Sequence, residues 1–373
     1  MRIAVVYHRD ERGNSYGMYI SEMLSEYASW LGYKIDTYHD YNEKNKHKIP
    51  ENIVISIPVN LNSSSGLWWM YNVKLPSVLN TINANILICL NGICSKIIKQ
   101  PQLLLLPDIT YLKYKKAAIY PWQKYSQKNF RRSINKAAAI ITYSNFAIEE
   151  ILKINTEAKS VQLTPFSASL QYHPLEWPER VLAKSQFTGN KEYFVCIMDG
   201  YSENEYIPVL KAFSKFKKWQ QSSMQMLFIT ENNFMAEALE EKIATYKYRE
   251  DVQLLDELTP KQIAELMASA YALIHIAGTD SNLLPLIQGM QSAVPVLTNK
   301  ANSVYEYCKD AVLYFDEKDF DSLGAQMIEV YKDENKRTTL TGFAKEQSQL
   351  FVQEKISEAL WKIVEASAAD SSK

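Results

Sequence analysis

Short runs of apolar residues, without strict alternation of polar and apolar positions, recur along the whole chain. A strand that is covered on both faces has this pattern, and parallel sheets are built from such strands. The pattern therefore predicts buried parallel strands. The runs are IAVVY (3–7), IVISI (53–57), ILICL (86–90), LLLL (103–106), AAIITY (138–143), YFVCIM (193–198), MLFIT (226–230), VQLL (252–255), YALIHI (271–276) and VPVL (294–297).

Segments with helical periodicity separate many of these runs. Examples are MYISEMLSEYASWLG (18–32), IPVLKAFSKFKKWQ (207–220) and TPKQIAELMASA (259–270), the last with Thr259 as its expected N-cap. Repeated alternation of strand and helix favours doubly wound α/β layers. The fold class expected from the pattern is thus α/β, with two Rossmann-like parallel sheets.

The polar stretch 169–192 divides the chain. It contains Pro174 and Pro178 and lacks a clear period, so it is interpreted as a linker. The expected domains are 1–168 and 169–356, and a C-terminal helix at about 357–373 is expected to pack back on the first. Two such domains facing each other place a ligand cleft between the carboxyl ends of their strands.

Composition narrows the class of protein. The chain has 373 residues, 47% of them hydrophobic, and a net charge of −1, which indicates no overall electrostatic preference for nucleic acid or for an anionic membrane. No window approaches twenty apolar residues, and the N-terminus lacks a signal-like core. The four cysteines are interpreted as buried free thiols. A cytoplasmic protein is expected.

Two segments leave alternatives open. KYSQKNFRRSINK (124–136) collects basic residues on one broad helical face, typical either of a solvated surface or of an interfacial helix at the inner face of a membrane. LWWMYN (67–72) fits core packing, sugar stacking or a partner surface.

The segment VQLLDELTPKQIAELMASAYALIHIAGTDSNLLPLIQGMQSAVPVLTNKANSVYEYCKDAVLYFDEKDFDSL resembles the nucleotide-sugar half of the retaining family 4 (group 1) GT-B glycosyltransferases. WWMYNVKLPSVLNTINANILICLNG, PQLLLLPDITYL and INKAAAIITYSNFAIEEI resemble the acceptor domain of that family. The resemblance covers roughly residues 1–350. It implies a GT-B fold with a central cleft and a UDP- or GDP-linked sugar as donor substrate, with no further cofactor and no metal.

The family uses two glutamates eight positions apart to hold the sugar and the ribose. Asp280 and Gln288 occupy those positions here, with Ser281 and Asn282 in the loop between them. Aspartate is shorter by one methylene, and glutamine loses the charge assistance that makes such hydrogen bonds roughly twice as strong. Asp280 also fits a simple helix N-cap. Glu306, in SVYEY, belongs to the same implied donor site.

The implied phosphate site differs more. Asp199 and Gly200 stand where the family has Gly-Arg, and Glu205 stands where it has Lys. At about 4 Å from a phosphate, each change from cation to acid turns attraction into repulsion of a few kcal/mol. The family pair His-Asp appears as Pro107-Asp108, which leaves Asp108 as the second candidate catalytic carboxylate.

Glycine is scarce, at 11 of 373 residues where about 7% is usual. Gly13 and Gly17, after the first strand, keep the backbone room that the family uses there. The DFD sequence at 319–321 resembles a metal motif, but it opens a helix and is better interpreted as a cap.

Three hypotheses follow. The first is a hexosyltransferase that uses a nucleotide-sugar with retention and acts on a glycan or lipid-linked acceptor in bacterial polysaccharide assembly. The second is a non-catalytic homologue that serves as a binding or activating partner subunit, favoured by Asp199, Glu205, Pro107 and Leu283. The third is an active enzyme whose donor carries less negative charge.

Overall fold

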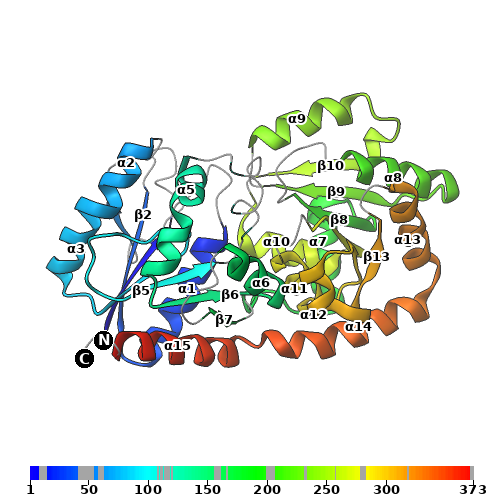
Figure 1. Cartoon of the computed structure of the whole chain (residues 1–373). Helices are drawn as coiled ribbons and strands as arrows, with labels where there is room; N and C mark the ends of the chain where they lie inside the picture. Colours follow the sequence, from blue (N-terminus) through cyan, green and yellow to red (C-terminus); the bar gives the residue numbers. More distant parts are fainter. Residues whose placement is uncertain are drawn as a thin grey trace. The chain divides into compact units, whose positions relative to one another are not determined.

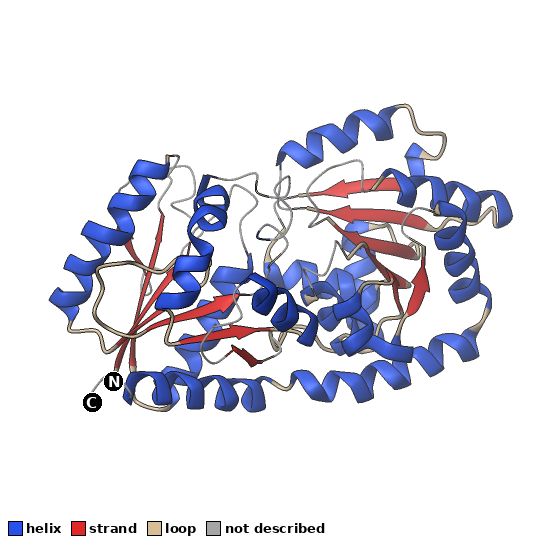
Figure 2. Cartoon of the chain, in the orientation of Figure 1, coloured by secondary structure: helices blue, strands red, loops and turns tan. Residues whose placement is uncertain are grey.

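The computed structural model describes residues 1–7, 15–40, 54–57, 63–106, 109, 112, 118, 121–154, 161–164, 167–198, 206–230, 233–256, 258–277, 283–316 and 319–369. Contacts between residues divide the chain into two compact units. The first unit comprises Met1–Phe166 and Glu354–Lys373, and the second comprises Ser167–Gln353. Each unit is built on one parallel sheet with flanking helices (Figures 1 and 2), as the apolar runs predict.

The sheet of the first unit has seven strands in the order β3-β2-β1-β4-β5-β6-β7. Every residue of β4 and of β5 is buried, which explains why both are apolar apart from Gln102 at the start of β5. The strands are β1 (Arg2–Tyr7), β2 (Lys34–Asp40), β3 (Val54–Ile57), β4 (Ile86–Cys89), β5 (Gln102–Leu106), β6 (Ala139–Thr142) and β7 (Val161–Leu163).

Helices cover both faces of this sheet. Right-handed crossovers put the helix between β1 and β2 on one face and those that follow β3 and β5 on the other (Figure 1). The helices are α1 (Ser15–Trp30), α2 (Ser64–Trp69), the π-helical segment η2 (Met70–Lys74), α3 (Leu75–Ile82), α5 (Pro121–Lys136) and α6 (Asn145–Ile154).

The C-terminal helix α15 (Gln353–Ala369) packs on the α1 side of the first unit. The rings of Tyr27 and Trp361 stack with their centroids 6.3 Å apart. The hydroxyl of Tyr33 donates to Glu365 Oε1 at 2.8 Å. Residues more than three hundred positions apart thus share one layer.

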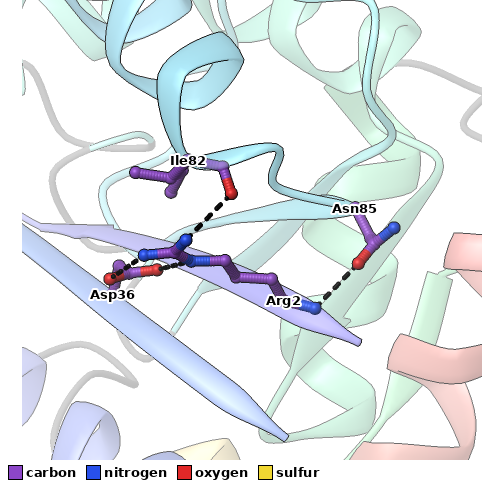
Figure 3. A network of polar contacts seen from close by, with 4 residues as sticks. All are labelled: Arg2, Asp36, Ile82 and Asn85. Carbon is purple, nitrogen blue, oxygen red and sulfur yellow. Dashed lines mark hydrogen bonds and ion pairs between the residues drawn. The ribbon is translucent and has the colours of Figure 1, made fainter.

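The amino ends of the first strands are fastened by Arg2 (Figure 3). Its guanidinium donates to both carboxylate oxygens of Asp36, at 2.6 and 3.1 Å, and to the carbonyl oxygen of Ile82 at 3.1 Å. Its backbone N–H donates to Asn85 Oδ1 at 2.7 Å. This bidentate contact joins β1, β2 and the end of α3 at the edge opposite the carboxyl ends of the strands.

The sheet of the second unit has six parallel strands in the order β10-β9-β8-β11-β12-β13. Its core lies between the sheet and helices such as α8, where Phe194, Phe213 and Phe216 are fully buried. The strands are β8 (Tyr193–Ile197), β9 (Gln225–Ile229), β10 (Val252–Leu255), β11 (Ala272–His275), β12 (Val296–Asn299) and β13 (Leu313–Phe315). The longer helices are α7 (Trp177–Phe187), α8 (Ile207–Trp219), α9 (Asn233–Ala244), α10 (Pro260–Ser269), α11 (Leu284–Gln291), α12 (Asn302–Cys308), α13 (Phe320–Lys332) and α14 (Glu334–Ser348).

The interpretation of 169–192 as linker without periodic structure is wrong, because α7 lies inside it. Pro178 occupies the first turn, where a missing N–H costs nothing. Glu176 and Glu179 form a capping box. The hydrophobic pattern did not predict this helix because several of its apolar residues are exposed, with Trp177 at 69% and Leu182 at 59%.

Within the described part of the chain, no helix combines the length and the apolar character needed to cross a bilayer. Thr259 caps α10 as expected, with a capping box to Gln262.

Candidate functional site

The strand order of the second sheet reverses between β8 and β11. These strands are neighbours, with Cys196 opposite Ile274, although β9 and β10 lie between them in sequence. Both strands are parallel, so they end at the same edge of the sheet. Ligands of open α/β sheets bind outside the carboxyl ends of the strands at such a reversal. The segments that begin at Asp199 and Gly278 follow these two strand ends directly.

Most of the predicted site residues fall outside the described residues. This holds for the candidate carboxylates Asp280 and Asp108. It also holds for four of the proposed binding residues, which are Gly13, Gly200, Ser281 and Asn282. Gln288, Glu306 and Gly17 are within the described part of the chain, and their positions are reported below.

Gln288 lies on α11, partly exposed, between buried residues. The next residue, Gly289, faces the sheet. A Cβ there would lie 2.8 Å from Leu273 Cδ2 on β11 and 3.0 Å from Val296 Cγ2 on β12. Only glycine allows α11 to pack this closely, and the close packing fixes the position of Gln288 relative to the ends of both strands.

Asn299, at the end of β12, is a positioning residue that the sequence pattern did not reveal. It is buried, and its Nδ2 donates to the carbonyl oxygen of Ala277 at 2.7 Å. This bond connects the end of β12 to the residue before Gly278. The signal in the sequence is an amide residue two positions after the apolar run VPVL, at the edge where the candidate loops emerge.

Glu306 lies on α12 and is partly exposed. Burial raises the pKa of the neighbouring Tyr307, and the negative charge of Glu306 raises it further. Lys300, after β12, holds its Nζ 5.0 Å from the ring centroid of Tyr305. The ring of Tyr305 therefore orients the ammonium group of Lys300, which follows the strand next to β11.

The first sheet reverses between β1 and β4, where Val6 is opposite Cys89. Gly13 follows β1 in sequence, and Gly17 lies in the first turn of α1. Asp108 follows β5, the strand next to β4. The three residues therefore follow the ends of two of the strands near this reversal.

The cysteines are free and buried in both units, as predicted. Burial raises the pKa of the Cys89 thiol well above its usual value, and a hydrogen bond with Cys94 adds to this. Burial also raises the pKa of Cys308 to about 12. Neither thiol is a nucleophile near neutral pH, because the thiolate is the reactive form.

Metal-binding side chains do not gather among the described residues, where no group of three or more His, Cys, Asp or Glu could hold an ion. Asp319 is the N-cap of α13, and its Oδ1 accepts from the backbone N–H of Asp321 at 2.9 Å. The interpretation of DFD as a cap is confirmed.

Part of the second unit is similar to a known protein family. Residues 179–347 match the family described as glycosyl transferases group 1. The O-antigen chain mannosyltransferase B of Escherichia coli is 22% identical over 231 residues, which cover 61% of this chain and 60% of that protein. The match thus spans less than two thirds of that relative.

Solved structures extend the likeness to the whole chain. Anabaena Alr3699/HepE, crystallised with UDP-glucose, superposes with a TM-score of 0.78 at 14% identity, covering 98% of this chain and 100% of that one. WaaG, a glycosyltransferase involved in lipopolysaccharide biosynthesis, gives 0.74 at 15% identity over 96% and 99%. Sucrose-phosphate synthase from Thermosynechococcus elongatus gives 0.76 at 14% identity over 99% and 100%.

Proposed function

We propose that this chain is a group 1 glycosyltransferase that transfers a hexose from a nucleotide-diphospho-sugar to a glycan or lipid-linked acceptor with retention. The family match of residues 179–347 and the likeness in fold to solved structures that include a glycosyltransferase support this proposal. In the reaction, an acceptor hydroxyl oxygen forms a bond to the anomeric carbon as the bond from that carbon to the diphosphate breaks. The nucleoside diphosphate leaves with the bonding electrons, and the acceptor loses its proton.

One observation carries the proposal. The segments that begin at Asp199 and Gly278 follow the two strands at the reversal of the second sheet, and Gln288 lies on the helix after the second segment. In this proposal Asp280 orients the sugar, Gln288 accepts a hydrogen bond from the ribose, and Glu306 completes the donor site. Backbone N–H groups near Gly200, Ser281 and Asn282 bind the diphosphate.

Two carboxylates serve the reaction in this proposal, Asp280 as the residue that orients the sugar and Asp108 as the second catalytic candidate. Gly13 and Gly17 supply backbone room for binding after β1. The names of similar proteins support a hexose, since one is a mannosyltransferase and another was crystallised with UDP-glucose. UDP- and GDP-linked donors both remain candidates.

A non-catalytic role as a partner subunit is the second candidate. Its supporting observation is the chemistry of the phosphate positions, where Asp199 and Glu205 replace cations and would repel a diphosphate. Leu283, at the start of α11, is 4% exposed and offers no polar group. Under this alternative, a protein partner takes the place of the nucleotide-sugar.

Titration calorimetry of the purified chain with UDP, GDP and their glucose and mannose conjugates tests the proposal. We expect micromolar binding of one nucleotide-sugar. Gln288→Glu, which restores the family's residue, should keep or tighten that binding. Asp280→Ala should lower transfer by about a hundredfold or more, as loss of a group that contacts the transition state does.

Asp310→Ala, an exposed carboxylate of the same unit, is the matched control and should leave binding and transfer unchanged. If neither the natural chain nor Gln288→Glu binds any of these ligands at millimolar concentration, the transferase proposal fails and the partner-subunit alternative stands.

A further inference from the structure

The proposed donor site lacks positive charge at the positions where its family carries it. Asp199 and Glu205, in the segment that follows β8, stand where cations are expected. A nucleoside diphosphate is an anion, and its negative charge grows as the bond to the sugar breaks, so its binding needs cations or aimed N–H groups. A chain that uses such a donor therefore needs a cation from another element at the same edge of the sheet.

Three neighbouring strands of the second sheet end on one level. Cys196 of β8 is opposite Ile274 of β11, and Ile274 is opposite Leu297 of β12. All three strands are parallel, so residues an equal number of positions further along share a level. Two positions further along, the level contains Met198, Ile276 and Asn299. The residue after Asn299 therefore leaves the sheet beside the reversal between β8 and β11.

That residue is Lys300, and its backbone is held in place. Asn299 is buried, and its Nδ2 donates to the carbonyl oxygen of Ala277 at 2.7 Å, which ties the end of β12 to the end of β11. Strands are spaced by about 4.8 Å, so a point midway between the ends of β8 and β11 lies about 7 Å from β12. A lysine side chain extends about 6 Å from its Cα, and its hydrogen bond to a phosphate adds about 3 Å. Lys300 can therefore reach a phosphate at the reversal.

The ammonium group of Lys300 is available for such a contact. It is exposed and lies 5.0 Å from the ring centroid of Tyr305, which is itself 53% exposed. Among the residues that the structure describes, Lys300 forms no ion pair, although Asp316 directly follows β13 on the other side of β12. An exposed aromatic ring attracts a cation weakly compared with a phosphate in contact. The ring thus holds the ammonium at this edge without competing with an anion.

We propose that Lys300 is the cation that binds the diphosphate of the donor, in place of the cations that the family carries after β8. Its ammonium offsets the negative charge of the bound donor and of the nucleoside diphosphate that leaves. This inference rests on the proposed transferase function and extends it, because it moves the source of positive charge from the end of β8 to the end of β12.

Titration calorimetry of the full chain with UDP, GDP, uridine and guanosine tests the assignment. We expect Lys300→Gln to weaken the binding of UDP or GDP by about tenfold or more, because a charge contact with the phosphates is lost. Binding of the matching nucleoside, which has no phosphate, should change by less than about twofold. Lys300→Arg keeps the charge and should recover most of the lost nucleotide affinity.

Lys309→Gln is the matched control, since it makes the same change in charge at another exposed lysine of the second unit. Lys309 precedes β13 in sequence and so belongs to the opposite, amino edge of the sheet. Because salt screens charges beyond about 8 to 10 Å, this variant should weaken nucleotide binding by less than about twofold. Melting temperatures of both glutamine variants should match that of the natural chain.

The outcomes separate this inference from the transferase proposal. If the natural chain binds UDP or GDP and Lys300→Gln weakens that binding no more than Lys309→Gln does, only the assignment of Lys300 fails. Equal weakening of nucleotide and nucleoside by Lys300→Gln would also overturn it, because the lysine would then act on the fold and not on the phosphates. If the natural chain binds neither nucleotide, the transferase proposal and the role of Lys300 fail together.

Discussion

Lys217 lies on α8 of the second unit and Lys128 lies on α5 of the first, and the surroundings of the two side chains differ. Lys217 is 6% exposed, pairs with Asp251 at 2.9 Å and donates to the carbonyl oxygens of Ser222 and Met224. Lys128 is exposed on α5 and pairs with no carboxylate among the described residues. Lys217 stabilises the fold of the second unit, whereas Lys128 adds to the positive electrostatic potential at the surface of the first.

The contrast shows that a net charge near zero does not reveal which cations stabilise the fold. A buried, paired cation costs stability when it is removed, because its partner is left without compensation. An exposed cation among like charges costs little or even raises stability when it is removed. Removing a lysine should therefore affect folding more when it is a buried, paired cation of the second unit than when it is an exposed cation of α5.

Lys217→Ala is expected to show the largest folding effect. Removing the ammonium leaves the carboxylate of Asp251, which is mostly buried, without a partner, at a cost of about 3 kcal/mol in the free energy of unfolding. Urea unfolding followed by circular dichroism measures it. Lys218→Ala, its exposed neighbour, should change the value by less than about 0.5 kcal/mol. Equal losses of unfolding free energy in the two variants would contradict the distinction between a buried, paired lysine and an exposed one.

Gly289→Ala tests whether close packing places Gln288. The new Cβ would overlap Leu273 and Val296, so we expect a loss of about 2 kcal/mol in unfolding free energy and weaker nucleotide-sugar binding. The control is Gly342→Ala on α14, where no atom lies within 4 Å of the added Cβ. That helix should gain about 0.5 kcal/mol. If Gly289→Ala changes neither the unfolding free energy nor nucleotide-sugar binding, α11 can shift to accommodate the added methyl group.

Two tyrosines, Tyr38 buried and Tyr246 partly buried, offer a smaller comparison. The Tyr246 hydroxyl donates to the carbonyl oxygen of Leu210 at 2.7 Å, whereas the Tyr38 hydroxyl makes no hydrogen bond to any described residue. Tyr246→Phe should therefore cost about 1 kcal/mol, and Tyr38→Phe almost nothing. Thermal melts near pH 8 measure both, and a larger loss from Tyr38→Phe would contradict the prediction.

The same pair predicts a loss of stability in alkali. Burial raises the pKa of Tyr38 and of Tyr246 from 10.0 to about 12. The unfolded chain loses these protons at lower pH than the folded chain does. Stability is therefore complete below pH 10 and falls as the pH rises from 10 to about 12. Each phenylalanine variant should show a shallower fall across this range, in melting temperature against pH.

Arg131→Gln with Arg132→Gln should have the smallest folding effect. We expect an unfolding free energy within about 0.5 kcal/mol of the natural chain, because both side chains are exposed. Relief of repulsion should make any gain larger at low salt than at high salt. Melting temperatures at the two ionic strengths measure it. A loss of stability at low salt would mean that these arginines serve the fold.

Much of the fold is visible in the sequence because central strands of a parallel sheet are buried on both sides. The runs at 86–90 and 103–106 correspond to β4 and β5 within one residue at each end. The strand β2, with sequence KIDTYHD, gave no such signal because Asp36 and Asp40 interrupt any apolar run around its buried Thr37 and Tyr38. The segment 67–72 was ambiguous because it is divided, with Met70 and Tyr71 buried and both tryptophans exposed.

The site was harder to predict than the fold. The reversal of strand order depends on pairings between β8 and β11, which are distant in sequence, and no local pattern records them. Asn299 shows the same difficulty, since its partner is a backbone carbonyl from another strand. The roles of Asp280, Asp108 and the other loop residues stay predictions. Net charge also misled, because a total of −1 gives no hint that residues 52–148 contain eleven basic residues and one acidic residue.

The position of α15 has a consequence for biosynthesis. Trp361 and Glu365 complete a layer that begins with Tyr27 and Tyr33, so the first unit to leave the ribosome is the last to be finished. The second unit contains all its own strands and can fold while the last helix is still inside the exit tunnel. A stalled or prematurely terminated chain would therefore display a finished second unit beside a first unit whose aromatic residues lack their cover.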